Sequence, residues 1–306
     1  MAGKQGKRSR SSSTITTVIF VIAVIAAILG RFNSNFEIDP ASTTAKITAA
    51  SNDVCAVHFI DVGQGSSVLL QSGSNGILID AGEKEYGDDV VNYLKSHGVT
   101  QLDYVVATHP HTDHIGGLLI VLNDINVKNV IMPKLTSSNA PTTKTYESFL
   151  QLIYDKNINA VAAKYGKMYN VGKINLTVLG PVEQNKDLNN MSVICKADAD
   201  STTFLLSGDA ETPEMRSVLK KFPNLSCDVM LMGHHGSRTS LEEEYLQLAD
   251  PSAAVIQCGL NNSYGHPHEE TIDYLKKNSI EYYRTDLSGS IVFTCSAKGY
   301  RVTTSK

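Results

Sequence analysis

Beyond about residue 54, the apolar and polar positions follow two patterns, one typical of helices and one typical of strands. Longer segments with apolar residues at helical spacing, such as 88–98 and 146–157, predict helices. Short apolar runs rich in β-branched residues and bounded by turn residues predict strands, at 54–62, 66–72, 76–82, 101–108, 129–133, 159–164, 174–181, 202–211, 227–237, 253–259, 279–285 and 290–297. Two packed sheets with helices outside would suit this mixed α/β pattern.

The first 53 residues differ in character from the rest. Residues 1–31 hold five basic side chains and no acidic one, and residues 15–30 carry no charge. A basic stretch before an apolar run is typical of a signal anchor or a signal peptide. We expect a basic cytoplasmic tail at 1–13, a transmembrane anchor at 14–32, a linker at 33–53 and an extracytoplasmic domain at 54–306. If the segment is cleaved, the domain is secreted.

Charge and cysteine content narrow the possibilities. With 27 basic and 31 acidic side chains in all, the chain beyond residue 31 has a formal charge of −9. That balance argues against nonspecific nucleic-acid binding through a basic surface. The five cysteines mostly lie in apolar runs, so we expect small buried hydrophobes; an odd count also rules out a complete disulfide framework.

The stretch "HPHTDHIGG" at 109–117 concentrates a third of the nine histidines on one turn. Imidazole and carboxylate are the usual ligands of zinc and similar divalent ions. His109 and His111 lie two residues apart and point the same way in an extended segment, and Asp113 and His114 follow as the chain turns. One loop can therefore serve two neighbouring metals; the alternative is a solvated polar loop.

Two further segments follow strand-like runs. Asp209 comes after "FLLSG" and could bridge two metals, or it could instead cap the following helix. "GHHGSR" places His234 and His235 before a loop whose N–H groups, with Ser237 and Arg238, would suit an anion. His235 is then a general acid or a phosphate contact, unless neither histidine has a role.

His266, in "YGHP", is a further metal-ligand candidate at a strand-to-helix junction. His268 is expected to be exposed, and His58 and His97 to be structural.

Taken in order, "ILIDAG", "HPHTDHIGG", "LLSGDA", "HHGS" and "YGHP" resemble the metallo-β-lactamase superfamily. "HFIDVGQGSS" is similar, more narrowly, to the metal-hydrolase domain of ComEC/Rec2 competence proteins. The likeness covers residues 54–302. It implies a four-layered αββα fold with two divalent metals between the sheets, zinc or alternatively manganese.

The resemblance also implies roles for single residues. It assigns the metal ligands as His109 and His111 for the first ion, Asp113 and His114 for the second, Asp209 as the bridge and His266 completing the second site. Asp80 would orient the metal loop. His235 would face the phosphate, with His234, Ser237 and Arg238 nearby. Asp113 and His235 are the catalytic candidates.

The sequence departs from the family pattern in two respects. No histidine occurs from 115 to 233, where the superfamily usually supplies another ligand; Asn190 and Ser192 are weak substitutes, so the first metal is expected to be bound loosely. A multi-helix channel, which competence proteins carry, is replaced by one short apolar run, so a role in DNA import does not transfer.

We therefore expect a membrane-anchored extracytoplasmic hydrolase that uses a metal-activated water on a phosphodiester, with DNA as a candidate substrate. The alternatives are hydrolysis of another ester or amide, such as a lactone or a cell-wall phosphocholine ester, and a non-catalytic surface module that keeps the fold.

Overall fold

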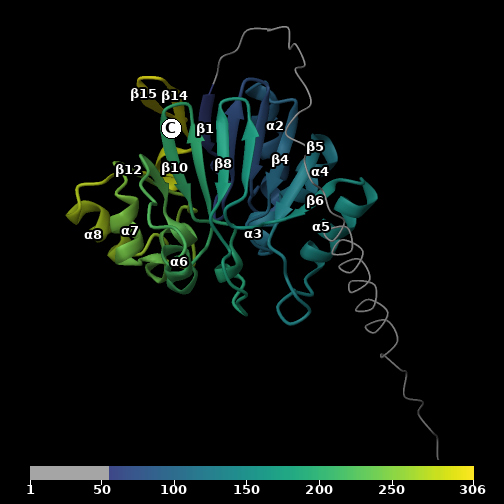
Figure 1. Cartoon of the computed structure of the whole chain (residues 1–306). Helices are drawn as coiled ribbons and strands as arrows, with labels where there is room; N and C mark the ends of the chain where they lie inside the picture. The colour runs from purple at the N-terminus through teal and green to yellow at the C-terminus, as the bar shows by residue number, and fades with distance from the viewer. Residues whose placement is uncertain (1–54) are drawn as a thin grey trace, which may run out of the picture.

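The computed structural model describes residues 55–306, so the predicted tail, anchor and linker lie outside the described residues. Among the residues described, no helix is long and apolar enough to cross a membrane. The described chain forms two sheets packed face to face, with helices on the outer face of each (Figure 1).

The first sheet has eight strands in the order β15-β14-β1-β2-β3-β4-β5-β6. Its pairings are antiparallel from β15 to β3 and parallel from β3 to β6. The strands are β1 (Cys55–Phe59), β2 (Val68–Ser72), β3 (Asn75–Ile79), β4 (Gln101–Val106), β5 (Asn126–Met132), β6 (Asn159–Ala162), β14 (Ile291–Ser296) and β15 (Gly299–Thr304).

The second sheet has seven strands in the order β13-β12-β11-β10-β9-β8-β7. Here β13 to β10 are parallel and β10 to β7 antiparallel, so each sheet contains one block of four parallel strands. The strands are β7 (Met168–Val171), β8 (Ile174–Val178), β9 (Cys195–Ala199), β10 (Thr202–Leu206), β11 (Val229–Leu231), β12 (Ala253–Ile256) and β13 (Glu281–Arg284).

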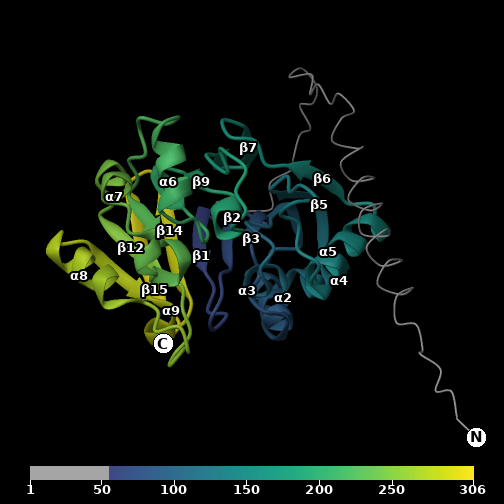
Figure 2. The ribbon, with the colours of Figure 1, turned by 90° about the horizontal axis from the view of Figure 1, so that it is seen from below.

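Helices cover the outer faces of the sheets on opposite sides of the molecule (Figure 2). On the first sheet these are α2 (Gly87–Ser96), α3 (Thr112–Ile115), α4 (Leu118–Asp124) and α5 (Lys144–Asp155). On the second they are α6 (Thr212–Leu219), α7 (Glu243–Ala249) and α8 (Glu269–Lys277); α9 (Thr285–Ser288) follows β13.

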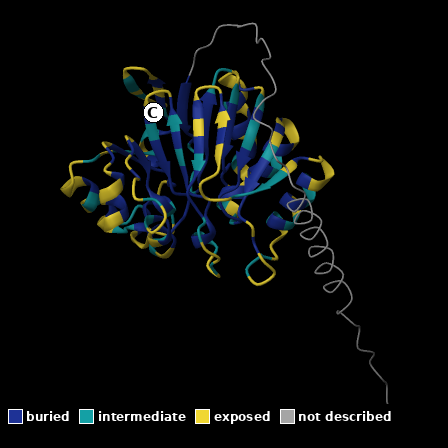
Figure 3. Cartoon of the chain, viewed as in Figure 1, coloured by how far each residue is buried: buried dark blue, intermediate teal, exposed yellow. Residues whose placement is uncertain are grey.

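Three separate apolar cores hold these layers together. One lies between the first sheet and its helices, one between the two sheets, and one between the second sheet and its helices. The inner strands are buried along most of their length, whereas β6, β13 and β15 at the sheet edges have only intermediate and exposed residues. Exposed residues are also frequent on the outer helix faces and in the loops (Figure 3). All five cysteines are buried and free, as the sequence predicted.

Candidate metal centre

The predicted site residues lie in loops that leave the carboxyl ends of parallel strands, where α/β sheets commonly place their ligands. Asp80 follows β3, and the 109–114 segment follows β4 in the first sheet. Asp209 follows β10, and His234 and His235 follow β11 in the second. Because these parallel blocks end at the same edge of the sandwich, residues more than a hundred positions apart converge.

The histidine-rich loop is fixed by neighbours on both sides. Asp113 and His114 lie in the short helix α3, and their carbonyl oxygens accept hydrogen bonds from Ser66 N (3.2 Å) and Ala81 N (2.9 Å). Close approach to the 61–67 loop requires Gly65, since a Cβ there would lie 2.6 Å from the Asp113 carbonyl oxygen. Gly65 of "VGQGSS" thus lets this loop pack closely against the metal loop.

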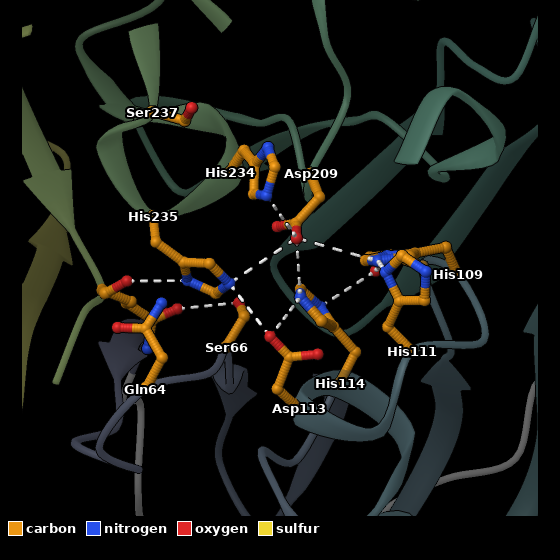
Figure 4. A network of polar contacts seen from close by, with 12 residues as sticks. Gln64, Ser66, His109, His111, Asp113, His114, Asp209, His234, His235 and Ser237 are labelled. Carbon is orange, nitrogen blue, oxygen red and sulfur yellow. Dashed lines mark hydrogen bonds and ion pairs between the residues drawn. The ribbon is translucent and has the colours of Figure 1, made fainter. Parts of the chain in front are cut away.

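Four side chains bring possible metal-binding atoms together: Asp113, His114, Asp209 and His235 each offer one atom, and all four atoms lie within 4.8 Å of one another. Asp209 Oδ2 is 3.1 Å from His114 Nε2 and 3.5 Å from His235 Nε2. His235 Nε2 is also 3.3 Å from Asp113 Oδ2. Figure 4 shows the Asp209 carboxylate between the imidazoles.

The hydrogen bonds of the imidazoles direct their other nitrogens into this cluster. His114 Nδ1 donates to Asp80 Oδ2 at 2.7 Å, and Asp80 is itself held by Thr108 N and Oγ1 at 2.8 and 2.6 Å. His235 Nδ1 donates to the Gln257 carbonyl oxygen at 2.9 Å. The Nε2 atoms of both histidines are buried without a hydrogen-bond partner. Two such lone pairs beside two carboxylates fit a divalent cation.

The charges of the cluster are strongly coupled. Burial acts to raise the pKa of Asp209, but His114 and His235 outweigh it and hold that pKa well below its usual range. Burial acts to lower the pKa of His114, yet Asp209, Asp80 and Asp113 raise it well above the ordinary value. A bound cation would take over this compensation of the carboxylates.

A second, smaller set of ligand atoms lies on the other side of Asp209. His109 Nε2 is 3.7 Å from Asp209 Oδ2 and 2.9 Å from His111 Nδ1. The segment at which this chain lacks the histidine that is usual in the superfamily adds no ligand here. Asn190 Oδ1 accepts a hydrogen bond from Glu214 N (3.2 Å), and Ser192 Oγ accepts one from Asp209 N (3.1 Å). These two residues support the neighbouring backbone.

The structure excludes the capping role that the sequence left open for Asp209. Helix α6 begins at Thr212, and its N-cap is Glu211, so Asp209 does not cap it. The Asp209 side chain instead faces the histidines. Its carboxylate lies within 4 Å of imidazole nitrogens of both ligand sets, in His109 and in His114.

His234 and His235 occupy a tight turn, and both have left-handed backbone angles, with φ of 48° and 56°. Residues other than glycine adopt this region at a cost of about 1 kcal/mol or more each, usually where the surroundings fix them. His234 Nδ1 lies 3.1 Å from Glu211 Oε1, while its Nε2 is 3.9 Å from Asp209 Oδ2. The turn therefore presents both histidines to the cluster.

His266 lies beside this group and not within it. Its ring centroid is 5.3 Å from that of His234 and 6.0 Å from that of His235, and its buried Nδ1 lacks a hydrogen-bond partner. The sequence assigned the second metal to His266 and the phosphate to His235. The geometry favours His235 as the ligand, and both roles stay predictions.

The predicted anion-binding role of Ser237 and Arg238 finds no support in the geometry. Ser237 points away from the cluster (Figure 4), and its Oγ lies 2.9 Å from Thr239 Oγ1. The Arg238 side chain is exposed and lies 3.6 Å from Glu270. A short 3-10 turn at 238–240 leaves Arg238 exposed and has the buried Ser237 as its N-cap, which the sequence pattern did not indicate.

Sequence reasoning missed several residues around the centre. Gln257 binds His235 through its carbonyl and Ser66 Oγ through Oε1 (2.9 Å), so it joins the two halves of the site. Gln64 and Tyr264 line a cavity of about 470 Å³ over the cluster, together with His111, Asp113, Asp209, His234, His235, His266 and residues of three loops. Gln64 could have been noticed, because it lies within "DVGQGSS".

Comparison with known proteins supports this architecture. ComE operon protein 3 of Bacillus subtilis (strain 168) is 32% identical over 258 residues, covering 78% of this chain and 32% of that protein. Recombination protein 2 of Haemophilus influenzae is 26% identical over 242 residues, covering 77% of this chain and 28% of that protein. The chain thus spans about a third of the length of these relatives.

A solved structure shows the same fold: the metallo-β-lactamase fold protein YhfI from Bacillus subtilis aligns with a TM-score of 0.52 at 17% identity, covering 76% of this chain and 96% of that one. The family model for the metallo-β-lactamase superfamily matches residues 60–259. These findings confirm the resemblance, and the chain belongs to the metallo-β-lactamase superfamily.

Proposed function

We propose that the domain is a metal-dependent phosphodiesterase. The observation that supports this most is the sharing of Asp209 between two sets of ligand atoms, one with His109 and His111 and one with Asp113, His114 and His235. Attack on phosphorus spreads negative charge over several oxygens, and two neighbouring cations suit that distribution. Bound divalent ions would supply Lewis-acid activation of water and of the phosphoryl group.

The chain's own residues have distinct tasks in this proposal. Asp209 contributes its carboxylate to both ligand sets. Asp80 and the Gln257 carbonyl fix the orientation of His114 and His235 through their Nδ1 atoms. His234, at the cavity wall and next to Glu211, offers a proton donor beside the reacting centre.

The relatives point in the same direction. One of them is named a recombination protein, and we take that name as support for a nucleic acid as the substrate. A DNA strand is therefore our preferred phosphodiester. The competing proposal, hydrolysis of a lactone or another ester, is favoured by the small number of ligands in the His109–His111 set, because one cation suffices to polarise a carbonyl oxygen.

The test is a substrate panel on the full-length chain after chelation and reloading with zinc or manganese. We expect hydrolysis of bis(p-nitrophenyl) phosphate that is lost on chelation and in His114→Ala. His97→Ala, a histidine change at the C-cap of α2 and outside the cavity, serves as the matched control. Full activity after chelation, or turnover of lactones alone, would refute the phosphodiesterase.

We also propose that residues 14–32 anchor the domain to the membrane with the catalytic cavity outside the cytoplasm. The uncharged run at 15–30 behind a basic tail supports this orientation. Protease added to intact cells should then release the domain while residues 1–13 stay protected. Protection of the whole chain until the cells are lysed would contradict it.

A further inference from the structure

The loop between β12 and α8 carries an exposed aromatic ring at the mouth of the cavity. The Tyr264 side chain is 66% exposed, yet it lines the same cavity as Asp113 and Asp209. An aromatic face left in water gains free energy when a flat apolar partner covers it. Its position at this cavity suggests that the partner is part of the substrate.

The side chain of Asn262 makes four hydrogen bonds within this loop. Asn262 Oδ1 accepts hydrogen bonds from Tyr264 N (3.2 Å) and His266 N (3.0 Å). Its Nδ2 donates to the carbonyl oxygens of Gly259 and His266. The backbone that presents Tyr264 is therefore ordered before a ligand arrives, which lowers the entropic cost of binding.

A series of rings connects Tyr264 with the metal cluster. Tyr264 and His266 are stacked, with centroids 5.7 Å apart and planes inclined by 20°. His266 and His235 follow with centroids 6.0 Å apart and planes inclined by 29°. Since His235 Nε2 faces Asp113 and Asp209, a substrate group on Tyr264 lies close enough to belong to the same molecule as a phosphodiester at the cluster.

The cavity offers little else to hold a nucleic acid. Among the described residues that line it there is no lysine or arginine, and the chain beyond residue 31 has a charge of −9. Proteins that grip the phosphate backbone use those cations and lose affinity steeply with salt. Base stacking on an aromatic side chain is the other general source of affinity for single strands.

We propose that Tyr264 is a stacking platform for a nucleobase, so that the preferred substrate is a single-stranded nucleic acid whose bases are free to unstack. This inference rests on the phosphodiesterase function proposed above. In a duplex the bases stack on one another and cannot cover the tyrosine ring, so paired strands are expected to be poorer substrates.

The experiment compares two strands that differ only in their bases: a short oligothymidylate and the abasic oligomer of the same length and charge. KM and kcat are measured on the metal-loaded full-length chain and its Tyr264→Ala and Tyr264→Phe variants. Loss of the ring should raise KM for the oligothymidylate about fivefold to a hundredfold, with kcat changed far less. Tyr264→Phe keeps the ring and should keep the low KM.

Leu260→Ala is the matched control, because Leu260 is equally exposed on the same loop but is not part of the cavity wall. A rise in KM that is as large for the abasic strand, or that also occurs in Leu260→Ala, would overturn the stacking role. Anisotropy of fluorescently labelled oligomers in Ca²⁺ measures binding apart from cleavage. If neither strand is cut but Tyr264 still selects the base-containing one, only the phosphodiesterase fails; equal or absent binding of both strands overturns the platform.

Discussion

The two sides of the candidate metal centre share Asp209 but differ in what they add to it. On one side, which we call the four-group side, Asp113, His114 and His235 join Asp209 within 4.8 Å. On the other, the histidine-pair side, His109 and His111 lie beside the same carboxylate with no further ligand among the described residues. The four-group side offers four possible ligand atoms, as many as a tetrahedral metal site uses, and the histidine-pair side offers one fewer.

Their supports differ as well. On the four-group side, the Nδ1 atoms of His114 and His235 donate to Asp80 and to the Gln257 carbonyl. On the histidine-pair side, His109 Nδ1 has only hydroxyl neighbours, at 3.1 Å in Thr108 and 3.4 Å in Ser192. Carboxylate and carbonyl partners raise the basicity of a ligating imidazole. From this difference we expect the four-group side to bind a divalent cation more tightly than the histidine-pair side.

The largest effect should come from breaking the four-group side. We expect His235→Ala to remove the tightly held metal and to lower phosphodiester turnover by about a thousandfold or more, because its Nε2 is one of four convergent ligand atoms. Metal content by atomic emission and turnover on the same preparation are the measurements. If His235→Ala keeps its metal content but loses activity, His235 is not a ligand and has the phosphate-facing role that the sequence suggested.

Removing the histidine pair should cost less. His109→Ala combined with His111→Ala is expected to eliminate the weaker ion and leave the other in place, lowering turnover by about a hundredfold. The three apolar cores do not depend on these side chains, so the fold should persist in circular dichroism. Loss of both ions in this variant would mean that the two sides bind metal as one unit.

A smaller effect is expected at the support of His114. Asp80→Asn keeps the shape of the side chain but removes the charge that accepts from His114 Nδ1 at 2.7 Å. Outer-sphere changes of this kind typically lower metal affinity or activity about tenfold to a hundredfold. Competition titration with a chromogenic chelator measures the affinity; a variant with wild-type affinity would show that Asp80 serves the fold alone.

Much of this centre was readable from the sequence, and the reasons are specific. The ligands at 109–114 are contiguous, so one turn determines their placement. Asp209 was identifiable because it follows a buried strand. The direction of the His235 ring was not, because it depends on the Gln257 carbonyl, which is placed by the parallel register of β11 and β12. Likewise, only the turn at 238–240 shows that Arg238 leaves the site.

The fold shows the same division. Local patterns located most strands, whereas the order of strands in the two sheets depends on pairings between residues far apart, such as β1 with β14. The sequence shows where the histidine ligand that is usual in the superfamily is absent, but it does not show what the residues at that place do instead. There the chain uses Asn190 and Ser192 to support the backbone of α6 and of Asp209, and this support leads to the last prediction.

Glu214, whose N–H donates to Asn190, is buried and should make stability depend on pH. Burial, assisted by nearby Glu183, raises the pKa of the Glu214 carboxyl from 4.5 to about 8. The folded state therefore holds a proton that the unfolded state releases between these values. The stabilisation is complete below pH 4.5 and is lost as pH rises to about 8, by up to about 1.4 kcal/mol per pH unit.

Glu214→Gln should remove this dependence, since an amide does not titrate and its oxygen can still accept from Val182 N, which now lies 2.7 Å from Glu214 Oε1. Urea unfolding of the chelated wild type and variant at several pH values isolates the contribution, because the other titrating groups are common to both. The wild type should lose stability relative to the variant from pH 4.5 to 8. Glu244→Gln, at an exposed position of α7, should show no such trend. A constant difference between wild type and Glu214→Gln would mean that the pKa of Glu214 is not raised on folding and that the buried carboxyl is ionised in the folded protein.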